Sequence, residues 1–416
     1  MLVSRDTGKS AGSRERGMPK PDDLKDYNYA VAGHAGTMCD ADGELFIKPC
    51  TQSEVEFYES AHAQHPDFAE IMPLYVGTLS LNEATDQAMI HAQIPNLVEH
   101  ADIPFSVKEE IQSHLHLDDR SSIAETPVEK EIISDNVKWI PNKARKIVTD
   151  RAVVLENASF GYKKPNIMDA KLGIRLWADD APSEKKDRFN KITEETTHKN
   201  FGFRVAGMRV YKGSTDEAEL DEEGFKIYDK DWGRFSVNDD NIVNSFKKFI
   251  FNEAAGIDKE LGKTIAGAFA EDLRRIQEIL EKEESRMYSS SLLFVFEGDG
   301  AALREAITEK KAIAERETND AIVLEHKRSS TRAPVSNLRV DSGIGMSEEE
   351  LCESVDIEAL DELEDDDSDE EFELPHIYTL KLIDFAHAAW KPGQGPDENV
   401  LLGVRSLAKI FEDMSE

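Results

Sequence analysis

Residues 165–173 place two opposite charges within the apolar pattern of a β-strand. The segment reads Pro-Asn-Ile-Met-Asp-Ala-Lys-Leu-Gly. Strand alternation puts Asp169 and Lys171 on one side and apolar residues on the other, so one strand end delivers a carboxylate and an ammonium group together. Phosphoryl transfer needs such a pair, because a cation neutralises the phosphate charge while a carboxylate orients a hydroxyl group or a ribose. A strand that ends in a surface ion pair would show the same pattern.

The chain is acidic, and much of its charge is concentrated in one segment. Its 416 residues include 84 Asp and Glu against 50 Lys and Arg, which gives a net charge of −34. Residues 341–373 hold seventeen of these acids and no Lys or Arg. Such a surface repels nucleic acid and anionic membranes, so we expect no direct nucleic-acid partner. No apolar run approaches the roughly 20 residues that a transmembrane helix needs.

The cysteines and the N-terminus bear on the compartment. Cys39, Cys50 and Cys352 show neither paired nor metal-ligand spacing, which favours a reducing compartment. The N-terminal residues lack the apolar core of a secretory signal. We therefore expect a nuclear and cytoplasmic protein.

Composition indicates two lobes interrupted by polar stretches. Residues 1–26 are polar and are expected to form a disordered tail. A first lobe is expected over residues 27–157, with a polar insertion at 99–136. A second lobe is expected over residues 158–416, with an acidic disordered insert at about 328–376.

Local patterns predict a mixture of short strands and amphipathic helices. Strands are expected at residues 44–49, 71–80, 88–94, 147–157, 165–173, 201–212, 289–297 and 378–385. Helices are expected from Ser53, as N-cap, through His62, from about Ser183, and over 239–252, 258–285, 301–327 and 397–413. The helix at 258–285 carries one apolar stripe that indicates a core-facing side, namely Leu261, Ile265, Phe269, Leu273, Ile276 and Leu280.

The first lobe contains a candidate phosphate-binding hairpin. Gly33 and Gly36 lie in a turn shortly before Lys48, which stands at the end of a predicted strand. Glycines let backbone N–H groups approach phosphate oxygens, and the lysine would add a point charge. Glu54, early on the next helix, could pair with Lys48 and direct it toward phosphate. An ordinary hairpin followed by a solvated helix glutamate remains the alternative.

The late strand brings a second carboxylate. It reads Leu-Lys-Leu-Ile-Asp-Phe-Ala-His and ends at Asp384 and His387. A carboxylate at the end of an apolar run is costly unless a cation neutralises it, and Mg²⁺ bridging phosphates is a natural cation. His387 is either a buried structural histidine or a substrate contact. The apolar strand Val153–Asn157 runs into the connection between the lobes, where main-chain atoms could hydrogen-bond an adenine.

A locally basic stretch follows the charged strand. Residues 163–191 contain eight Lys and Arg against five acids, in contrast to the rest of the chain. Lys185 and Arg188 lie three residues apart and therefore share one helix face. A basic pocket in an acidic protein favours a small, heavily phosphorylated substrate. A solvated basic helix face is the alternative.

Three motifs occur together and in order. They are Pro165-X-X-X-Asp169-X-Lys171-X-Gly173, Ser290-Ser-Leu-Leu-Phe-Val-Phe-Glu-Gly298 and Ile383-Asp-Phe-Ala-His387. This combination resembles the signature of the inositol polyphosphate kinase family. The resemblance covers the chain from about Val31 onward, apart from the inserts at 99–136 and 301–376. Within the family, the chain is most similar to multikinases of fungal type.

The resemblance implies an α+β fold with two lobes, distantly related to protein kinases. Antiparallel sheets with flanking helices would hold ATP between the lobes. It implies an ATP- and Mg²⁺-dependent kinase that converts inositol trisphosphate to tetrakis- and pentakisphosphate, and a lipid substrate is compatible with it. The alternative within the family is an inositol hexakisphosphate kinase that makes pyrophosphates.

The resemblance also implies roles for individual residues. Those expected to contact ATP or its metal ion are Lys48, Glu54, Glu156, Ala158, Asp169 and Asp384, with Asp384 as the metal ligand. Those expected to contact the inositol phosphate, mostly from the segment 174–200, are Lys171, Arg175, Lys185, Arg188 and His387. Lys171, Asp169 and Asp384 would form the catalytic group. Lys171 would face the transferred phosphoryl group, whereas Asp169 would bind the ribose more than remove a proton.

A different class of function is a regulatory scaffold. Residues 341–373 alternate acids with bulky apolar residues, which suits contacts with transcription-regulatory proteins. A solvating insert without a partner is the alternative, and this composition favours it slightly over a scaffold.

Overall fold

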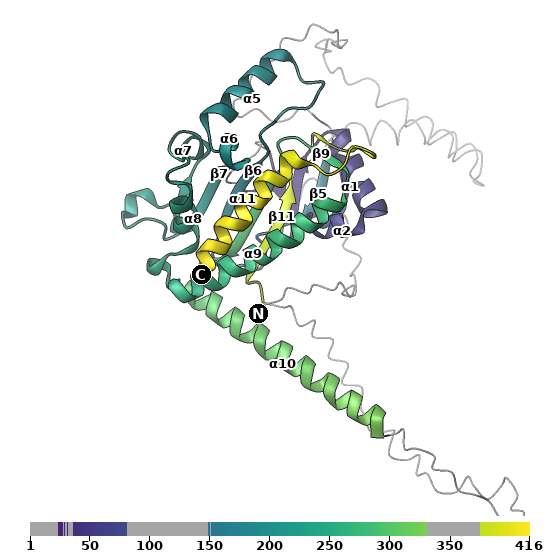
Figure 1. Ribbon diagram of the computed structural model, residues 1–416. Helices are drawn as coiled ribbons and strands as arrows, with labels where there is room; N and C mark the ends of the chain where they lie inside the picture. The colour runs from purple at the N-terminus through teal and green to yellow at the C-terminus, as the bar shows by residue number, and fades with distance from the viewer. Residues whose placement is uncertain are drawn as a thin grey trace, which may run out of the picture. The chain divides into compact units, whose positions relative to one another are not determined.

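The computed structural model is shown in Figure 1. It describes residues 24–27, 29, 31, 36–80, 149, 151–330 and 375–416. The insertion expected at 99–136, the strand expected at 88–94, the acidic tract 341–373 and Gly33 therefore lie outside the described residues. Residues 1–303 and 377–416 form one compact unit, and residues 304–376 form a second.

The N-terminal lobe of the first unit is a five-stranded antiparallel sheet. Its order is β1-β2-β3-β5-β4, and its strands are β1 (Lys25–Asp26), β2 (Met38–Cys39), β3 (Leu45–Pro49), β4 (Tyr75–Ser80) and β5 (Arg151–Glu156). The expectation of a tail over 1–26 is wrong at its end. Lys25 pairs with Cys39 and Asp26 with Met38, so these two residues extend the sheet.

Helix α1 (Gln52–Gln64) connects this sheet to the short α2 (Pro66–Glu70). It begins one residue before Ser53, because Thr51 is the N-cap and its hydroxyl accepts the Glu54 N–H at 3.4 Å. The buried face of α1 includes Phe57 and Tyr58 and also Glu54, which is 1% exposed. Burial of Glu54 on this face places its carboxylate beside the end of β3.

The C-terminal lobe is built on a second five-stranded antiparallel sheet. Its order is β11-β10-β6-β7-β8, and its strands are β6 (Pro165–Leu172), β7 (Phe203–Tyr211), β8 (Phe225–Tyr228), β10 (Ser291–Glu297) and β11 (Tyr378–Ile383). Strands β9 (Ser285–Met287) and β12 (Ala388–Trp390) form a separate two-stranded sheet. These antiparallel sheets and their helices confirm the predicted α+β class.

Strand β6 lies in the middle of this sheet and is buried on both faces. Its residue Met168 pairs with Phe294 of β10. Phe294 packs against Phe269 and Phe411, with ring centroids 5.2 Å and 5.1 Å away. Helices therefore cover the Met168 face, and the Asp169 face is left for the space between the sheets.

The helices of the C-terminal lobe are α5 (Ser183–Glu195), α6 (His198–Phe201), α7 (Lys230–Phe235), α8 (Ile242–Ile250), α9 (Lys259–Lys282) and α11 (Glu398–Ser415). Short 3₁₀ turns span Glu217–Glu219 and Glu253–Ala255. Helices α9 and α11 lie side by side across the sheet (Figure 1). The apolar stripe predicted along 258–285 is buried at all six positions.

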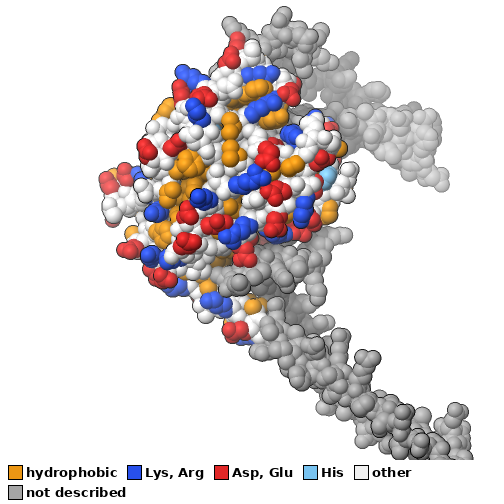
Figure 2. Space-filling view, viewed as in Figure 1, with side chains coloured by type: hydrophobic (Ala, Val, Ile, Leu, Met, Phe, Trp, Pro, Cys, Tyr) orange, Lys and Arg blue, Asp and Glu red, His pale blue; other side chains and the backbone are white. Residues whose placement is uncertain are grey.

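The expected charged helix forms as α10 (Gly300–Ser330), and residues from Arg304 onward belong to the second unit. None of the helices in the described part of the chain has the length and hydropathy that a membrane crossing requires. On the face shown in Figure 2, acidic and basic side chains are interspersed over the described residues. Two such ion pairs, Arg274–Glu412 and Arg405–Glu281 at 2.9 Å each, join α9 to α11.

Candidate active site

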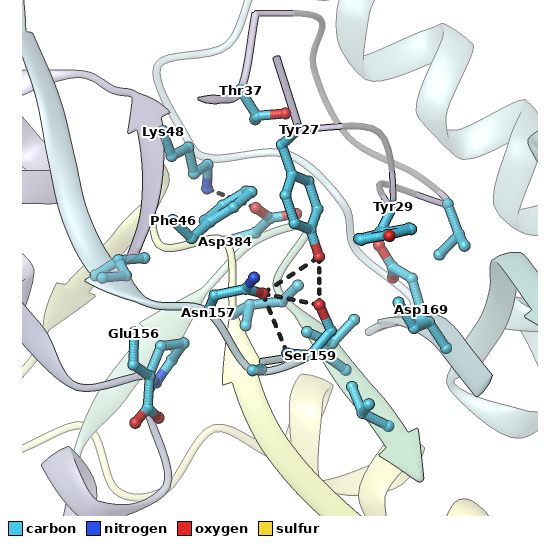
Figure 3. A pocket seen from close by; sticks show the side chains of 18 of the residues that line it. Tyr27, Tyr29, Thr37, Phe46, Lys48, Glu156, Asn157, Ser159, Asp169 and Asp384 are labelled. Atoms are coloured by element: carbon cyan, nitrogen blue, oxygen red, sulfur yellow. Dashed lines mark hydrogen bonds and ion pairs between the residues drawn. The ribbon is translucent and has the colours of Figure 1, made fainter. Parts of the chain in front are cut away.

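A pocket lies between the two sheets (Figure 3). Its empty space, counting the open mouth, is about 930 Å³. Both sheets and the connection between them line it, through Tyr27, Tyr29, Val31, Thr37, Phe46, Lys48, Pro49, Tyr58, Pro73, Leu155, Glu156, Asn157, Ala158, Ser159, Ile167, Asp169, Leu293, Val295, Ile383 and Asp384. Apolar walls with a few charged groups at one end suit a flat, charged ligand such as a nucleotide.

The connection between the lobes offers one backbone donor. The N–H groups of Glu156 and Asn157 donate to Leu74 O at 3.0 Å and Glu44 O at 2.8 Å. The Ser159 N–H donates to the Asn157 side chain at 3.1 Å. The Ala158 N–H has no hydrogen-bond partner in the described part of the chain. A ligand in the pocket can therefore take a hydrogen bond from Ala158, whereas Glu156 has only its carbonyl oxygen to offer.

The Glu156 side chain does not point into the pocket. Its carboxylate lies 3.0 Å from the Lys381 ammonium group. Figure 3 shows it turned away from Tyr27 and Asp169. Any contact between Glu156 and a ligand thus involves the backbone, as the sequence analysis expects.

A hydroxyl cluster that the sequence analysis missed supports this connection. The Tyr27 hydroxyl donates to Asn157 Oδ1 at 3.3 Å and lies 2.9 Å from Ser159 Oγ. Burial raises the pKa of Tyr27 to about 12, although the Ser159 hydrogen bond opposes the shift. The Asn157 amide also donates to Gly43 O at 2.7 Å. Tyr27, which follows β1, thereby joins the edge of the N-terminal sheet to the connection between the lobes (Figure 3).

Lys48 stands between two carboxylates at the charged end of the pocket. Its Nζ lies 2.7 Å from Glu54 Oε1 and 2.6 Å from Asp384 Oδ1. Burial alone would lower the Lys48 pKa, but the charges of Asp384 and Glu54 raise it well above its ordinary value. Lys48 is therefore an ammonium ion, and the predicted pairing with Glu54 is present.

Asp384 is held in an uncommon backbone conformation. Its φ is +68°, in the left-handed region that few residues other than glycine adopt. The next N–H, of Phe385, donates to Glu54 Oε1 at 3.3 Å. Asp384 Oδ2 lies 3.8 Å from Lys171 Nζ. The turn after β11 thus sets one carboxylate between Lys48 of the first lobe and Lys171 of the second.

Asp169 is the most deeply buried carboxylate that lines the pocket. It is 4% exposed, and its Oδ1 has no hydrogen-bond partner among the described residues. Burial raises the Asp169 pKa, while the charge of Lys171 lowers it. A buried acceptor without a partner is costly. A hydroxyl group of a ligand in the pocket would satisfy it.

A second group of predicted residues forms around helix α5. Lys185 Nζ lies 3.3 Å from His387 Nε2, although 202 residues separate them in sequence. Burial lowers the Lys185 pKa, and the charge of Asp180 opposes this shift. His387 is exposed, which contradicts the alternative of a buried structural histidine. Neither residue lines the nucleotide-sized pocket.

The remaining basic candidates differ in their surroundings. The Arg175 guanidinium pairs with Asp179, donates to Trp177 O at 3.0 Å and stacks 4.0 Å from the Trp177 ring. Arg188 lies on the exposed surface of α5, one turn after Lys185. Arg175 is therefore part of the folded loop, Lys185 is half-buried beside His387, and Arg188 is exposed on α5.

A metal ion would need ligands from outside the protein. In the ranges that the structure describes, no three His, Cys, Asp or Glu side chains come together as a metal site. Asp384 at the charged end of the pocket is a single carboxylate ligand. Phosphate oxygens and water would have to complete the coordination, as is usual for Mg²⁺.

Known proteins resemble this chain in sequence and in fold. The family model described as "Inositol polyphosphate kinase" matches residues 152–412. Inositol polyphosphate multikinase of Saccharomyces cerevisiae is 29% identical over 405 residues, which cover 92% of this chain and 96% of that protein. Human inositol hexakisphosphate kinase 1 is 25% identical, with 66% of this chain and 54% of that protein covered.

A solved structure shares the fold. The crystal structure of inositol phosphate multikinase Ipk2 from S. cerevisiae, in complex with ADP and Mn²⁺, matches with a TM-score of 0.50 and 24% identity, covering 90% of this chain and 100% of that one. This likeness confirms the two-lobed α+β fold. The family model spans more than half of the sequence and includes all three motifs found in it. The chain therefore belongs to the inositol polyphosphate kinase family.

Proposed function

We propose that this chain is an inositol polyphosphate multikinase that phosphorylates inositol trisphosphate to tetrakis- and pentakisphosphate with ATP. The observation that carries the proposal is the convergence of Lys48, Asp384 and Lys171 at the charged end of the pocket, with separations of 2.6 Å and 3.8 Å. The similarity to the yeast multikinase over 92% of the chain supports the same substrate class.

The nucleotide contacts follow from the geometry of the pocket. The Ala158 N–H would hydrogen-bond the adenine, and the Asp169 carboxylate would accept from the ribose hydroxyls. Lys48 would neutralise phosphate charge, and Glu54 would keep its ammonium group in place. Asp384 would hold Mg²⁺, which supplies further positive charge to the phosphate oxygens.

The substrate contacts lie on the other side of Asp384. Lys171 would stabilise the charge that develops on the transferred phosphoryl group. Lys185 and His387 would bind phosphates of the inositol ring, with Arg188 as a further cation on α5. Phosphoryl transfer through a loose transition state needs little base assistance. Asp169 is therefore not required to remove the proton of the attacked hydroxyl.

The test is a two-substrate kinase assay. Purified protein with Mg-ATP should phosphorylate inositol trisphosphate, with products resolved by anion-exchange chromatography. No phosphorylated product would contradict the proposal. Faster turnover of inositol hexakisphosphate than of the trisphosphate would indicate a pyrophosphate-forming kinase instead. A phosphoinositide in mixed micelles tests the lipid substrate in the same format.

We also propose a nuclear and cytoplasmic distribution, with regulatory proteins binding through residues 341–373. The charge of this tract and the wide spacing of Cys39, Cys50 and Cys352 in the sequence support these expectations. Imaging of the tagged chain tests the distribution. Deletion of residues 330–373 tests the partner: unchanged turnover with a lost partner would support the scaffold role, and no change in either would indicate a solvating insert.

A further inference from the structure

The short segment Gly173–Leu176 joins the catalytic strand β6 to the loop that leads into α5. Side chains distant in sequence hold its backbone. Asn399, in the first turn of α11, accepts from the N–H groups of Ile174 and Arg175, each at 2.8 Å. Its amide nitrogen donates to Arg175 O at 3.0 Å. One amide side chain thus satisfies three backbone groups in two consecutive residues.

The fit between Asn399 and this segment is tight. Gly173 has a φ of +93°, and a Cβ added there would lie 2.5 Å from Asn399 Nδ2. Asn399 is itself fixed, because Asp397 caps α11, accepts the Asn399 N–H at 3.2 Å and accepts the Met287 N–H at 2.7 Å. The start of α11 therefore serves as a rigid support for the residues that follow Lys171.

Ser289 holds the same segment from the opposite direction. Its φ is +63°, so its backbone adopts a conformation that is uncommon for a residue with a side chain. Its hydroxyl donates to Leu176 O at 2.9 Å, and its own carbonyl accepts from Lys171 Nζ at 2.7 Å. Ser289 therefore contacts both the catalytic lysine and the segment after it.

Helix α5 completes the connection. Its Thr193 hydroxyl donates to Ile174 O at 2.7 Å, so Ile174 is fixed by Asn399 at its nitrogen and by α5 at its oxygen. Lys185, which reaches His387, lies on the same helix. The position of the basic helix relative to Lys171 thus depends on a few backbone groups whose partners are the side chains of Asn399, Ser289 and Thr193.

We propose that Asn399 and Ser289 are positioning residues that set the placement of the inositol phosphate relative to Lys171. The inference rests on the proposed function, since it assigns the substrate to the side of α5. Displacement of a reacting group by about 1 Å can cost as much as about 100-fold in rate. Ala158, Asp169 and Lys48, which are proposed to contact the nucleotide, have no hydrogen bond to this segment among the described residues.

The experiment compares three variants in steady-state kinetics. Asn399→Ala removes three hydrogen bonds, and we expect about a tenfold loss of kcat/KM for inositol trisphosphate with the KM for ATP changed less than about twofold. Asn399→Asp keeps both acceptor bonds and should lie between Asn399→Ala and the wild type. Ser289→Gly keeps the left-handed conformation and the carbonyl but loses the Leu176 bond, so we expect about a threefold loss.

Asn252→Ala is the matched control. The Asn252 amide donates to Tyr211 O at 2.7 Å and Lys212 O at 3.2 Å, and it does not bond the segment 173–176. This variant should lower the melting temperature while leaving both KM values unchanged. Kinetics of Asn399→Ala and Ser289→Gly that match the control would overturn the positioning role alone. Absence of inositol phosphate turnover in the wild type would overturn the proposed function and this inference with it.

Discussion

The nucleotide pocket and the substrate helix organise their charges in different ways. In the pocket, Lys48 is 13% exposed and its partner Glu54 1%, and Lys48 forms direct ion pairs with both Glu54 and Asp384. On α5, Lys185 is half-buried and reaches the exposed His387 at 3.3 Å. The charges of the first region are fixed before a ligand arrives, whereas the second carries a half-buried Lys185 and an exposed Arg188 on α5.

This difference has a physical consequence for how each ligand is recognised. Charges interact more strongly where water is excluded, so the buried network can tolerate little change. Exposed cations on a helix adapt to several orientations of a polyphosphate, at the cost of weaker and salt-sensitive contacts. A kinase that phosphorylates more than one position of a ring needs a rigid donor site and an adaptable acceptor site, which is the combination found here.

The largest effect is expected where the two regions meet. Asp384→Asn and Lys171→Ala should each lower kcat by about 10²–10³-fold, because each removes a preorganised charge from the transferred phosphoryl group. Steady-state assays with Mg-ATP and inositol trisphosphate measure this loss. Circular dichroism would verify that both variants fold. Undiminished turnover in either variant would place the chemistry elsewhere in the molecule.

The sequence could predict the elements that carry this chemistry because their signals are local. Strand β6 follows from the alternation in residues 165–173, and the strand that carries Asp384 at its end follows from the apolar run before it. The pairing of Lys48 with Glu54 spans only six residues, so a strand followed by a helix is enough to predict it. Each of these predictions depends on neighbouring residues and on the period of one element.

The contacts that support the site were not predictable in the same way. Tyr27 meets Asn157 across 130 residues, and Asn399 meets Ile174 across 225 residues. Such bonds join residues that are distant in sequence, so no periodic pattern indicates them. The left-handed conformation of Ser289 is also invisible in sequence, because serine has no preference for it. Tertiary packing decides these positions.

Binding of inositol trisphosphate at α5 should depend on the positive charge of Lys185. Lys185→Gln should raise the KM for inositol trisphosphate about tenfold, which corresponds to the loss of one charge-assisted hydrogen bond. The KM for ATP should stay within about twofold of the wild type. The same assays at rising salt should weaken trisphosphate binding less in the variant than in the wild type. Equal changes in both KM values would remove the distinction between the two regions.

The two regions also differ in their response to acid. Burial and the charge of Arg204 lower the pKa of His198, which lies in α6 beside β7, to about 3. In the pocket, by contrast, burial raises the pKa of Asp169. Below its ordinary pKa of 6.5, the unfolded chain protonates His198 and the folded chain does not. The free energy of unfolding should therefore fall as the pH falls toward about 3, with a contribution from His198 of about 1 kcal/mol at pH 5.5.

Urea denaturation of the wild type and His198→Met at pH 7.5 and 5.5 measures this contribution. Methionine cannot titrate, so the variant should lose less stability between the two pH values than the wild type does. Other groups titrate equally in both proteins and cancel in the comparison. Parallel losses in the two proteins would show that His198 is already protonated in the folded chain.

The smallest effect is expected from the hydroxyl cluster of Tyr27, Asn157 and Ser159, which lines the pocket. Tyr27→Phe removes the bonds to Asn157 and Ser159 but keeps the ring in place. Ser159 Oγ still donates to Asn157 Oδ1 at 2.9 Å, and the Asn157 amide still donates to Gly43 O at 2.7 Å, so the connection between the lobes stays formed. We expect about a threefold rise in the KM for ATP, equivalent to one ordinary hydrogen bond. The KM for inositol trisphosphate should be unchanged, because Lys185 and His387 do not line the pocket that this cluster supports. A larger effect on the trisphosphate than on ATP would mean that the pocket and the substrate helix do not act as separate recognition sites.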